Sequence, residues 1–199
     1  MKSVFVLTLI GFFSALLLYG TNKIAEKSIE KAVAKAKIQA LKKIFPFKFE
    51  SENISKVQDK KGRTFFEIKD KKGKLKGIAL EVSGEKGYGG KIEVLMAVSP
   101  KGKVFDYCIL SHNETPGLGS KIEEKSFRKQ FKGKDLKNYK WKVKQDKGDV
   151  DAITGATISS RAITDILENG LKIIKFRYIE EGKKCGKNLK KESSKRTRS

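Results

Sequence analysis

The sequence predicts an α+β protein, with an N-terminal transmembrane helix followed by one domain in which helices flank an antiparallel β-sheet. An uninterrupted apolar run near the N-terminus predicts the transmembrane helix. Short apolar runs that alternate with turn signals in the middle of the chain predict the sheet. A C-terminal stretch whose apolar residues recur every three or four positions predicts a packed helix. At 199 residues, the chain has the length of one domain with appendages.

The apolar run covers residues 4–19, with Lys2 before it and Lys23 after it. As a helix it would be about 24 Å long, slightly less than the roughly 30 Å hydrocarbon core of a bilayer. A cleaved signal peptide is the alternative, but no small-x-small cleavage site follows the run. We therefore assign residues 1–23 to a retained single-pass anchor.

Lysines are denser after this run than before it, which by the positive-inside rule places the domain in the cytoplasm. Long hydrophilic domains translocate largely regardless of charge, however, and Glu26 and Glu30 show that the next segment is not purely basic. Charge alone therefore leaves the topology of the anchor open.

Residues 24–46 predict an amphipathic linker helix that continues from the anchor. Apolar residues recur at helical spacing from Ala25 to Ile44, and Pro46 ends the helix. We expect its apolar face to dock on the domain. A helix that lies on the membrane surface is the alternative, which its lysines favour.

The region that follows predicts four strands, at residues 64–68, 75–82, 91–98 and 104–110. The sequences Asp-Lys-Lys-Gly at 70–73 and Ser-Pro-Lys-Gly at 99–102 predict hairpin turns. The expected result is two hairpins in one antiparallel sheet. Residues 84–90 hold four glycines, a pattern that can cradle phosphate but more often marks a mobile loop.

Residues 121–132 predict a short helix with Ile122, Phe127 and Phe131 turned inward. Residues 139–143 alternate large side chains with lysine, which predicts a further strand with Trp141 in the core. The last helix is expected to run from the end of the 151–157 stretch to about Tyr178. Its apolar positions are Ala162, Ile163, Ile166, Leu167, Leu171 and Ile174.

The formal net charge is +22, a value that raises nucleic acid, anionic lipid or an acidic protein as partners. The lysines are spread along the chain and nucleic-acid recognition motifs are missing, so we expect a solvated lysine surface and no nucleic-acid partner. The one dense cluster lies in the tail, residues 180–199, which we expect to be disordered or bound to a partner.

The cysteines and the single histidine have modest predicted roles. Cys108 lies in a predicted strand and is expected to be a small buried hydrophobe. Whether it pairs with Cys185 stays open, and the spacing predicts no metal site. His112 follows a predicted strand, where we expect it to hydrogen-bond within a loop rather than to transfer protons.

The stretch Asp-Ala-Ile-Thr-Gly-Ala-Thr at residues 151–157 joins a turn to the start of the last helix. Gly155 and Ala156 let the backbone turn tightly and approach a ligand, and a helix N-terminus favours an anion. Candidate points for esterification are the hydroxyls of Thr154, Thr157, Ser159 and Ser160. Threonine and serine at a helix start are also ordinary caps.

A second stretch, Glu-Thr-Pro-Gly-Leu-Gly, occupies residues 114–119. The proline makes the loop rigid, and its two glycines permit a close approach of the backbone. Leu118 offers an apolar contact for a ring, while Glu114 and Thr115 supply polar contacts.

These two stretches, together with Gly-Tyr-Gly-Gly-Lys-Ile at residues 87–92, resemble the FMN-binding domain family. That family is found in the G subunit of the Rnf ion-translocating electron transport complex and in the C subunit of the sodium-pumping NADH:quinone oxidoreductase. In it, the last threonine of Asp-x-x-Thr-Gly-Ala-Thr carries FMN through a phosphoester bond, and the matching position here is Thr157. Thr154 stands where serine is commoner in the family.

The resemblance implies an FMN-binding domain at residues 47–179, with FMN bound covalently to Thr157. The other implied cofactor-binding residues are Thr154, Gly155, Ala156, Ser159, Glu114, Thr115, Gly117 and Leu118. Asp151 is implied either in recognition by the flavin transferase that forms the bond or as a cap of the turn. No residue is assigned a catalytic role, because the cofactor carries the electrons and the protein positions it.

The implied function is that of an electron-carrying subunit of a membrane-bound, ion-translocating ferredoxin:NAD oxidoreductase, without turnover of its own. The domain would lie outside the cytoplasm, with membrane lipid and the integral-membrane and iron–sulfur subunits as partners. One alternative is the C subunit of the sodium pump, although that relative is longer than this chain. A stand-alone flavin carrier and, from another class, a membrane-anchored polyanion-binding protein are the others.

Overall fold

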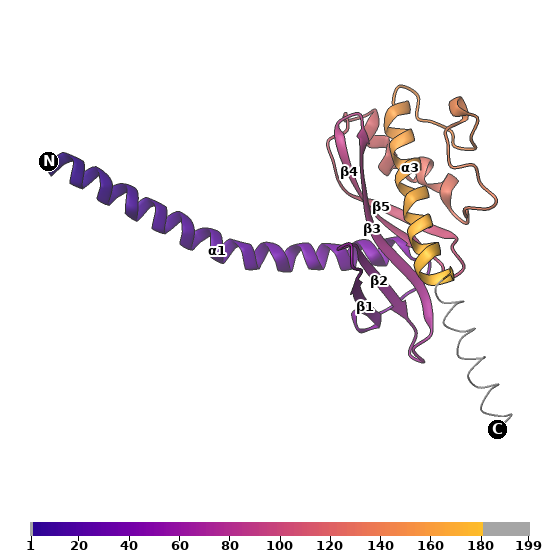
Figure 1. Cartoon of the computed structure of the whole chain (residues 1–199), viewed down its shortest axis with the longest axis horizontal. Coiled ribbons are helices and arrows are strands. Elements are labelled where there is room, and N and C mark those ends of the chain that lie inside the picture. The colour runs from indigo at the N-terminus through magenta and orange to yellow at the C-terminus, as the bar shows by residue number, and fades with distance from the viewer. Residues whose placement is uncertain (1, 181–199) are drawn as a thin grey trace. The chain divides into compact units, whose positions relative to one another are not determined.

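The computed structural model describes residues 2–180 (Figure 1). The predicted basic tail from residue 181 onward, with Cys185, lies outside the described residues. The chain divides into two compact units, Met1–Gln39 and Ala40–Ser199.

A single helix, α1 (Lys2–Ile44), accounts for all described residues of the first unit and enters the second. It ends just before Pro46, because a proline disfavours helical backbone in the residue that precedes it. Within the described part of the chain, no helix is both long and apolar enough to cross a bilayer. The anchor at residues 1–23 therefore stays a prediction.

The second unit is built on one five-stranded antiparallel sheet in which each strand pairs with the next along the chain. The strands are β1 (Ile54–Gln58), β2 (Thr64–Lys69), β3 (Leu75–Gly87), β4 (Gly90–Val98) and β5 (Val104–His112). The four predicted strands and both predicted hairpin turns are confirmed. The edge strand β1 was missed, because Ile-Ser-Lys-Val-Gln has few apolar residues and none of them is buried.

The glycine-rich segment at residues 84–90 is a β-hairpin, so the expectation of a mobile loop was wrong. Strand β3 continues to Gly87, which pairs with Gly90, and Tyr88 and Gly89 form the tip. A side chain at Gly89 would collide with the backbone carbonyl of Asn113. The glycines therefore permit another loop to pack on the hairpin tip.

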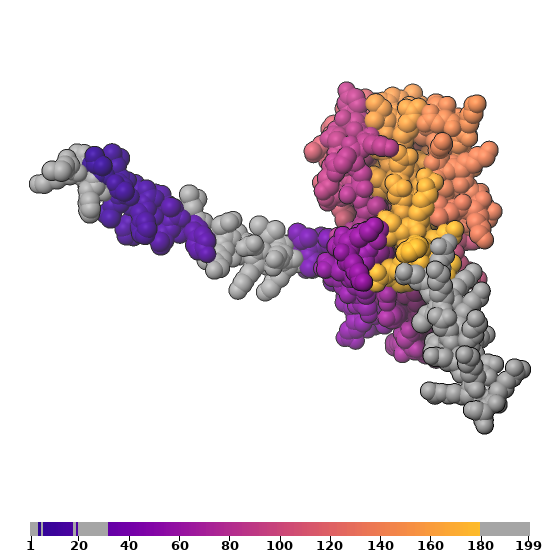
Figure 2. Space-filling view, viewed as in Figure 1, coloured from indigo at the N-terminus to yellow at the C-terminus, as the bar shows by residue number. Residues whose placement is uncertain are grey.

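Helix α3 (Thr157–Ile174) covers one face of the sheet and runs alongside β3 (Figure 1). All six apolar positions predicted for its inner face are buried. In Figure 2 the side chains of the β3–β4 hairpin, in magenta, lie against those of α3, in orange. A π-helical segment, η5 (Lys175–Glu180), continues from α3 and carries Tyr178, whose hydroxyl donates to Glu67 at 2.9 Å.

The opposite face of the sheet packs on the last turn of α1 and on the segment after it. Leu41, Ile44 and Phe45 are buried there against Ile68 and Leu95. The predicted docking of the linker helix is thus seen at its C-terminal end.

The segment predicted as one helix at residues 121–132 consists of three short pieces, η2 (Gly119–Glu123), α2 (Lys125–Arg128) and η3 (Lys129–Phe131). An extended backbone at Glu124 separates the first two. Ile122, Phe127 and Phe131 are buried as predicted.

Residues 139–143 form no strand of the sheet, so that prediction was wrong. Burial alternates along this segment, and Trp141 stacks on Phe131 in the core with ring centroids 5.8 Å apart. Its backbone, however, hydrogen-bonds with residues 148–150, and the one β-bridge described there is the isolated parallel pair Val143 and Val150. Burial that alternates every second residue indicates an extended backbone, but an extended segment need not join a sheet.

Candidate functional site

A hollow of about 510 Å³ lies where the tip of the β3–β4 hairpin, the loop after β5 and the start of α3 meet. We call it the α3 hollow. Its lining residues are Tyr88, Glu114, Thr115, Leu118, Gly119, Gly155, Ala156, Thr157, Ile158 and Ser159. All the predicted cofactor-binding residues except Thr154 and Gly117 therefore line one site, although they come from two stretches far apart in sequence.

Glu114 holds the three segments of the α3 hollow together. Its side chain is buried, with Oε1 accepting the N–H of Gly89 at 3.1 Å and Oε2 accepting the hydroxyl of Ser159 at 2.5 Å. One carboxylate thus links the hairpin tip, the loop and α3. Because both oxygens are used within the protein, Glu114 positions the walls of the hollow, a role that differs from the predicted polar contact with the cofactor.

Glycines make room for this carboxylate. A Cβ at Gly87 would collide with Oε1 of Glu114, and one at Gly119 would lie 2.6 Å from Oε2 and 2.9 Å from the Ser159 hydroxyl. Gly119 belongs to the predicted loop motif and Gly87 to the hairpin motif. One glycine of each motif is therefore explained by the packing around one buried acid.

His112 fixes the backbone of Glu114. Its Nδ1 accepts the N–H of Glu114 at 3.0 Å, and its Nε2 lies 3.0 Å from Oε1 of Glu123. A neutral ring that accepts at Nδ1 carries its proton on Nε2 and donates it to Glu123. The prediction of a hydrogen-bonding role within the loop is confirmed.

The four candidate hydroxyls have different surroundings. Ser159 is buried and donates to Glu114, while Ser160 is buried and donates to the carbonyl of Ala156 at 2.9 Å. Thr154 is exposed and lies outside the hollow lining. Thr157 is half-buried, lines the hollow and has no hydrogen bond from its side chain to any described residue. Its hydroxyl is the one of the four that is both in the hollow and uncommitted.

The start of α3 is arranged for an anion. The N-cap is Ala156, so no side chain caps the helix, contrary to the reading of these hydroxyls as ordinary caps. Gly155 adopts a φ of 78°, which lets the chain turn into the helix directly beside Leu118. The first N–H groups of a helix have no intrahelical partner, so they are available to phosphate oxygens at this point.

The rim of the α3 hollow is apolar. From residue 40 to residue 180, the exposed large hydrophobic side chains are Tyr88, Leu118, Ile158 and Phe176, and the first three all line this hollow. Exposed apolar side chains that gather at one place mark a binding site more often than scattered ones do. An apolar rim of this kind suits the ring system of FMN and the uncapped helix start suits its phosphate, so the residues present fit FMN.

Asp151 lies apart from this constellation. Its side chain is exposed, does not line the α3 hollow and pairs with Lys144 at 2.7 Å. The backbone of Asp151 is held by Gln130, which accepts its N–H at 2.8 Å. The carboxylate caps no backbone group of the described turn, which speaks against the second of its two predicted roles.

Sequence reasoning missed three lining residues, Tyr88, Gly119 and Ile158. Tyr88 could have been predicted, because a large aromatic residue between glycines at a hairpin tip has no core to enter.

Cys108, expected to be buried, is only partly buried, and this burial raises the pKa of its thiol to about 11.

Comparison with known proteins supports this part of the chain as the functional region. Residues 87–172, from the hairpin tip through most of α3, match the FMN-binding domain family. The predicted resemblance to the FMN-binding domain family is confirmed. The match includes every residue that lines the α3 hollow.

Curated relatives of this chain are named as subunits of oxidoreductase complexes. The chain is 54% identical over 93 residues to the G subunit of the proton-translocating ferredoxin:NAD(+) oxidoreductase complex of Clostridium ljungdahlii, covering 45% of this chain and 49% of that one. It is 41% identical over 104 residues to the G subunit of the ion-translocating oxidoreductase complex of Shewanella baltica, covering 50% and 49%. The matched region thus spans about half the length of these relatives.

Among solved structures, the fold is similar to that of the C subunit of the Na(+)-translocating NADH-quinone reductase from Parabacteroides distasonis. The TM-score is 0.47 at 24% identity, over 58% of this chain and 62% of that one. NqrC from Shewanella oneidensis gives a TM-score of 0.46 at 23% identity, over 65% and 68%.

Proposed function

We propose that the chain holds FMN covalently, through a phosphoester bond to Thr157, and carries electrons as one subunit of a membrane-bound, ion-translocating ferredoxin:NAD oxidoreductase complex. The observation that carries the proposal is the setting of Thr157. Its uncommitted hydroxyl lies in a hollow with an uncapped helix start on one side and an apolar rim on the other. When bound, FMN supplies the one- and two-electron chemistry.

The protein's own residues hold and orient the cofactor in this proposal. The N–H groups at the start of α3 would bind the phosphate, and Thr157 would fix its position. Tyr88, Leu118 and Ile158 would contact the ring system and exclude water from it. Thr115, Gly155 and Ala156 line the hollow, while the hydrogen bond between Ser159 and Glu114 holds α3 to the loop after β5. Gly117 and Thr154 lie outside the hollow lining, and Gly117 adopts a φ of 76° in its loop.

Asp151 fits the role of a recognition group for a flavin transferase. A separate enzyme must reach the motif from outside, and Asp151 is an exposed motif residue whose carboxylate supports no part of the hollow. Asp151→Asn keeps the size of the side chain and removes its charge. We expect it to lower the fraction of flavinylated protein without lowering the free energy of unfolding.

The membrane part of the proposal rests on residues 4–19. Their described apolar side chains, from Val4 to Tyr19, are exposed on α1 and need an apolar partner. We propose a single-pass anchor in the cell membrane with the domain outside the cytoplasm, where a tether would prevent loss of the cofactor. The partners would be the integral-membrane and iron–sulfur subunits of the complex.

Covalent attachment is tested by in-gel fluorescence of denatured protein after co-expression with a flavin transferase. We expect a fluorescent band from the wild type and from Thr154→Ala, and a dark band from Thr157→Ala. Thr154→Ala is the matched control, because it removes a motif hydroxyl that lies outside the hollow. A dark wild-type band would exclude covalent FMN, and a fluorescent Thr157→Ala band would assign the attachment to another residue.

Assembly is tested by affinity purification of the full chain from its membranes. A member of an ion pump should co-purify with integral-membrane and iron–sulfur proteins in constant proportion. A chain that carries FMN but purifies alone would be a stand-alone flavin carrier.

A further inference from the structure

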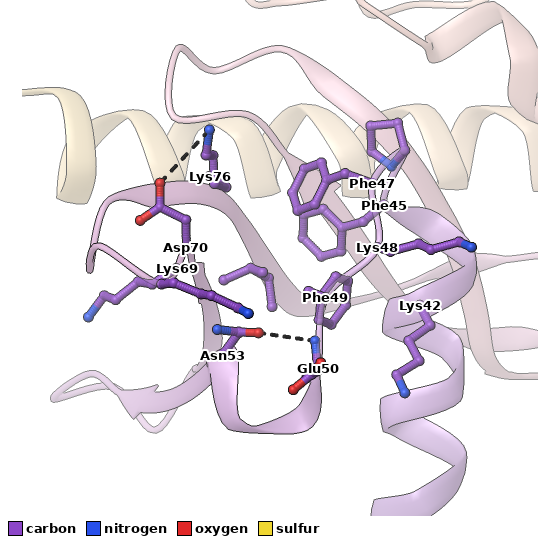
Figure 3. Close-up of a pocket in the computed structure, with 13 residues that line it drawn as sticks. Lys42, Phe45, Phe47, Lys48, Phe49, Glu50, Asn53, Lys69, Asp70 and Lys76 are labelled. Carbon is purple, nitrogen blue, oxygen red and sulfur yellow. Dashed lines mark hydrogen bonds and ion pairs between the residues drawn. The ribbon is translucent and has the colours of Figure 1, made fainter.

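A second hollow, of about 890 Å³, lies on the sheet face opposite α3 (Figure 3). The last turn of α1, the segment that follows it and the turn between β2 and β3 enclose it. We call it the Phe–Lys pocket, because phenylalanine rings form its wall and lysines form its rim. All its lining residues belong to the second unit of the chain.

Contacts with the core of the protein hold the wall of the Phe–Lys pocket in place. Phe45 is buried, and its ring lies so close to the backbone of β3 that a Cβ at Gly77 would collide with it. Phe47 and Phe49 pack on Phe45 with ring centroids 5.3 Å and 5.5 Å away. Both of these outer rings are only half-buried. The core thus fixes one ring, which holds two partly open rings against the hollow (Figure 3).

The rim carries an excess of positive charge. Five lysines line the pocket with only two acidic residues, Glu50 and Asp70. Lys76 pairs with Asp70 at 3.9 Å, and Lys69 pairs with Glu67 at 2.9 Å. The other three, Lys42, Lys48 and Lys71, form no ion pair with any described residue.

The pocket therefore places partly open aromatic rings beside exposed lysines that no described carboxylate neutralises. An inorganic anion would satisfy the lysines and leave the rings in contact with water. A neutral apolar molecule would cover the rings and leave the cationic rim without a counter-charge. A molecule with an apolar body and an anionic head satisfies both at once.

We propose that the Phe–Lys pocket binds an anionic phospholipid, with an acyl chain against Phe47 and Phe49 and the phosphate between Lys42 and Lys48. Charge complementarity selects the head group, and the aromatic wall selects a molecule with a tail. The site is independent of the flavin proposal, since no residue lines both hollows.

Native mass spectrometry of the full chain in neutral detergent tests the proposal, with phosphatidylglycerol and phosphatidylcholine of identical acyl chains as probes. We expect phosphatidylglycerol adducts at lower lipid concentration than phosphatidylcholine adducts. Lys42→Ala/Lys48→Ala should raise the phosphatidylglycerol concentration for half-occupancy on the order of 25-fold, or about fivefold per lysine. Phe47→Ala should weaken binding of the same lipid without changing the preference for the anionic head group.

The matched control is Lys101→Ala/Lys137→Ala, which removes the same charge from exposed lysines outside the pocket and should leave lipid binding unchanged. Equal loss in this control would overturn the proposal, because binding would then follow net charge. Equal affinity for both lipids, or displacement of the lipid by inorganic phosphate or an acidic peptide at the same site, would overturn it as well.

A second measurement separates the pocket from the predicted anchor. Phosphatidylglycerol with a photoreactive acyl chain is cross-linked to the full chain, and the modified peptides are sequenced. We expect cross-links within residues 45–53, which should disappear in Lys42→Ala/Lys48→Ala. Cross-links confined to residues 4–19 would show that the anchor takes up the lipid and would exclude the pocket.

Discussion

The α3 hollow and the Phe–Lys pocket lie at opposite ends of the same strand, and they are built in opposite ways. Tyr88 follows the end of β3 and lines the first, whereas Lys76 near the start of β3 lines the second. Glycines, backbone groups and one buried carboxylate form the α3 hollow. Large aromatic and long charged side chains form the Phe–Lys pocket.

This difference in construction predicts how each region responds to amino-acid substitutions. A site made of backbone in close contact has no spare volume, so one added carbon atom displaces a segment. A site made of side chains at a rim loses its contacts one at a time, because exposed charges are separated by solvent. A single substitution should therefore cause a large loss of stability at the α3 hollow. At the Phe–Lys pocket, each substitution should cause a small, separate loss of lipid affinity.

The largest effect on stability is expected at the hairpin tip, from Gly89→Ala. The new Cβ would collide with the backbone carbonyl of Asn113, which cannot rotate away as a side chain could. We expect the free energy of unfolding to fall by about 3 kcal/mol, as measured by urea denaturation.

Gly62→Ala is the control for backbone strain alone. Gly62 has a φ of 75°, and an added Cβ would meet no atom within 4 Å. We expect a loss of about 1 kcal/mol there. If the free energy of unfolding fell equally in the two variants, close packing at the hairpin tip would not distinguish the α3 hollow from an ordinary turn.

A second buried polar anchor of the fold is Asp106 of β5. Its buried carboxylate pairs with Arg128 at 2.6 Å and Lys132 at 3.0 Å. Burial by itself raises the pKa of Asp106, but the hydrogen bonds from Arg128 and Lys132 outweigh it and hold the pKa below its usual value. Asp106→Asn should lower the free energy of unfolding at pH 7 by about 2 kcal/mol.

The pH dependence of this pair has a definite sign. Because the folded pKa of Asp106 lies below the unfolded value of about 3.9, the ion pair stabilises the fold fully above that value and is lost as the pH falls through the folded pKa. Urea denaturation of the wild type should therefore show stability that falls steeply below about pH 4, while Asp106→Asn shows a shallower decline. Parallel curves for the two proteins would mean that other carboxylates govern the acid response.

A smaller effect is expected from Glu114→Gln. An amide keeps an oxygen for the N–H of Gly89 and can donate its NH₂ to the Ser159 hydroxyl, but it loses the charge that strengthens both bonds. We expect thermal denaturation to report a loss of about 1.5 kcal/mol. Glu114→Ala, which leaves both donors unpaired, should cost more, and equal losses would show that the charge matters more than the bonds.

The two regions also differ in how far sequence could predict them. The α3 hollow was predicted because its chemistry lies in contiguous motifs, so that Thr157, Gly155 and Leu118 could be named. The role of Glu114 was missed because its partners, Gly89 and Ser159, lie 25 and 45 residues away and only the fold brings them together. Local sequence indicates which residues are unusual, and long-range contacts decide what they do.

The Phe–Lys pocket was not predicted at all. Three phenylalanines alternate with other residues at positions 45–49, after the end of α1, but this alternation does not indicate which of the rings is buried. Phe45 became the wall because it packs on Gly77 of β3, a contact that exists only after the sheet has formed. The segment at residues 139–143 was predicted wrongly for a related reason, because the sequence of an extended segment does not indicate which strand it pairs with.

The last prediction is that substitutions at one hollow leave binding at the other unchanged. It tests whether the two regions are independent. Sites that share no partners and lie far apart change independently. Lys42→Ala/Lys48→Ala should therefore leave in-gel flavin fluorescence unchanged, and Thr157→Ala should leave phosphatidylglycerol binding unchanged. A change in either direction would mean that β3, which ends at both hollows, transmits the state of one to the other. The free energies of unfolding of the separate and combined variants would then fail to add, and the size of that deviation would measure the coupling between the two ends of the sheet.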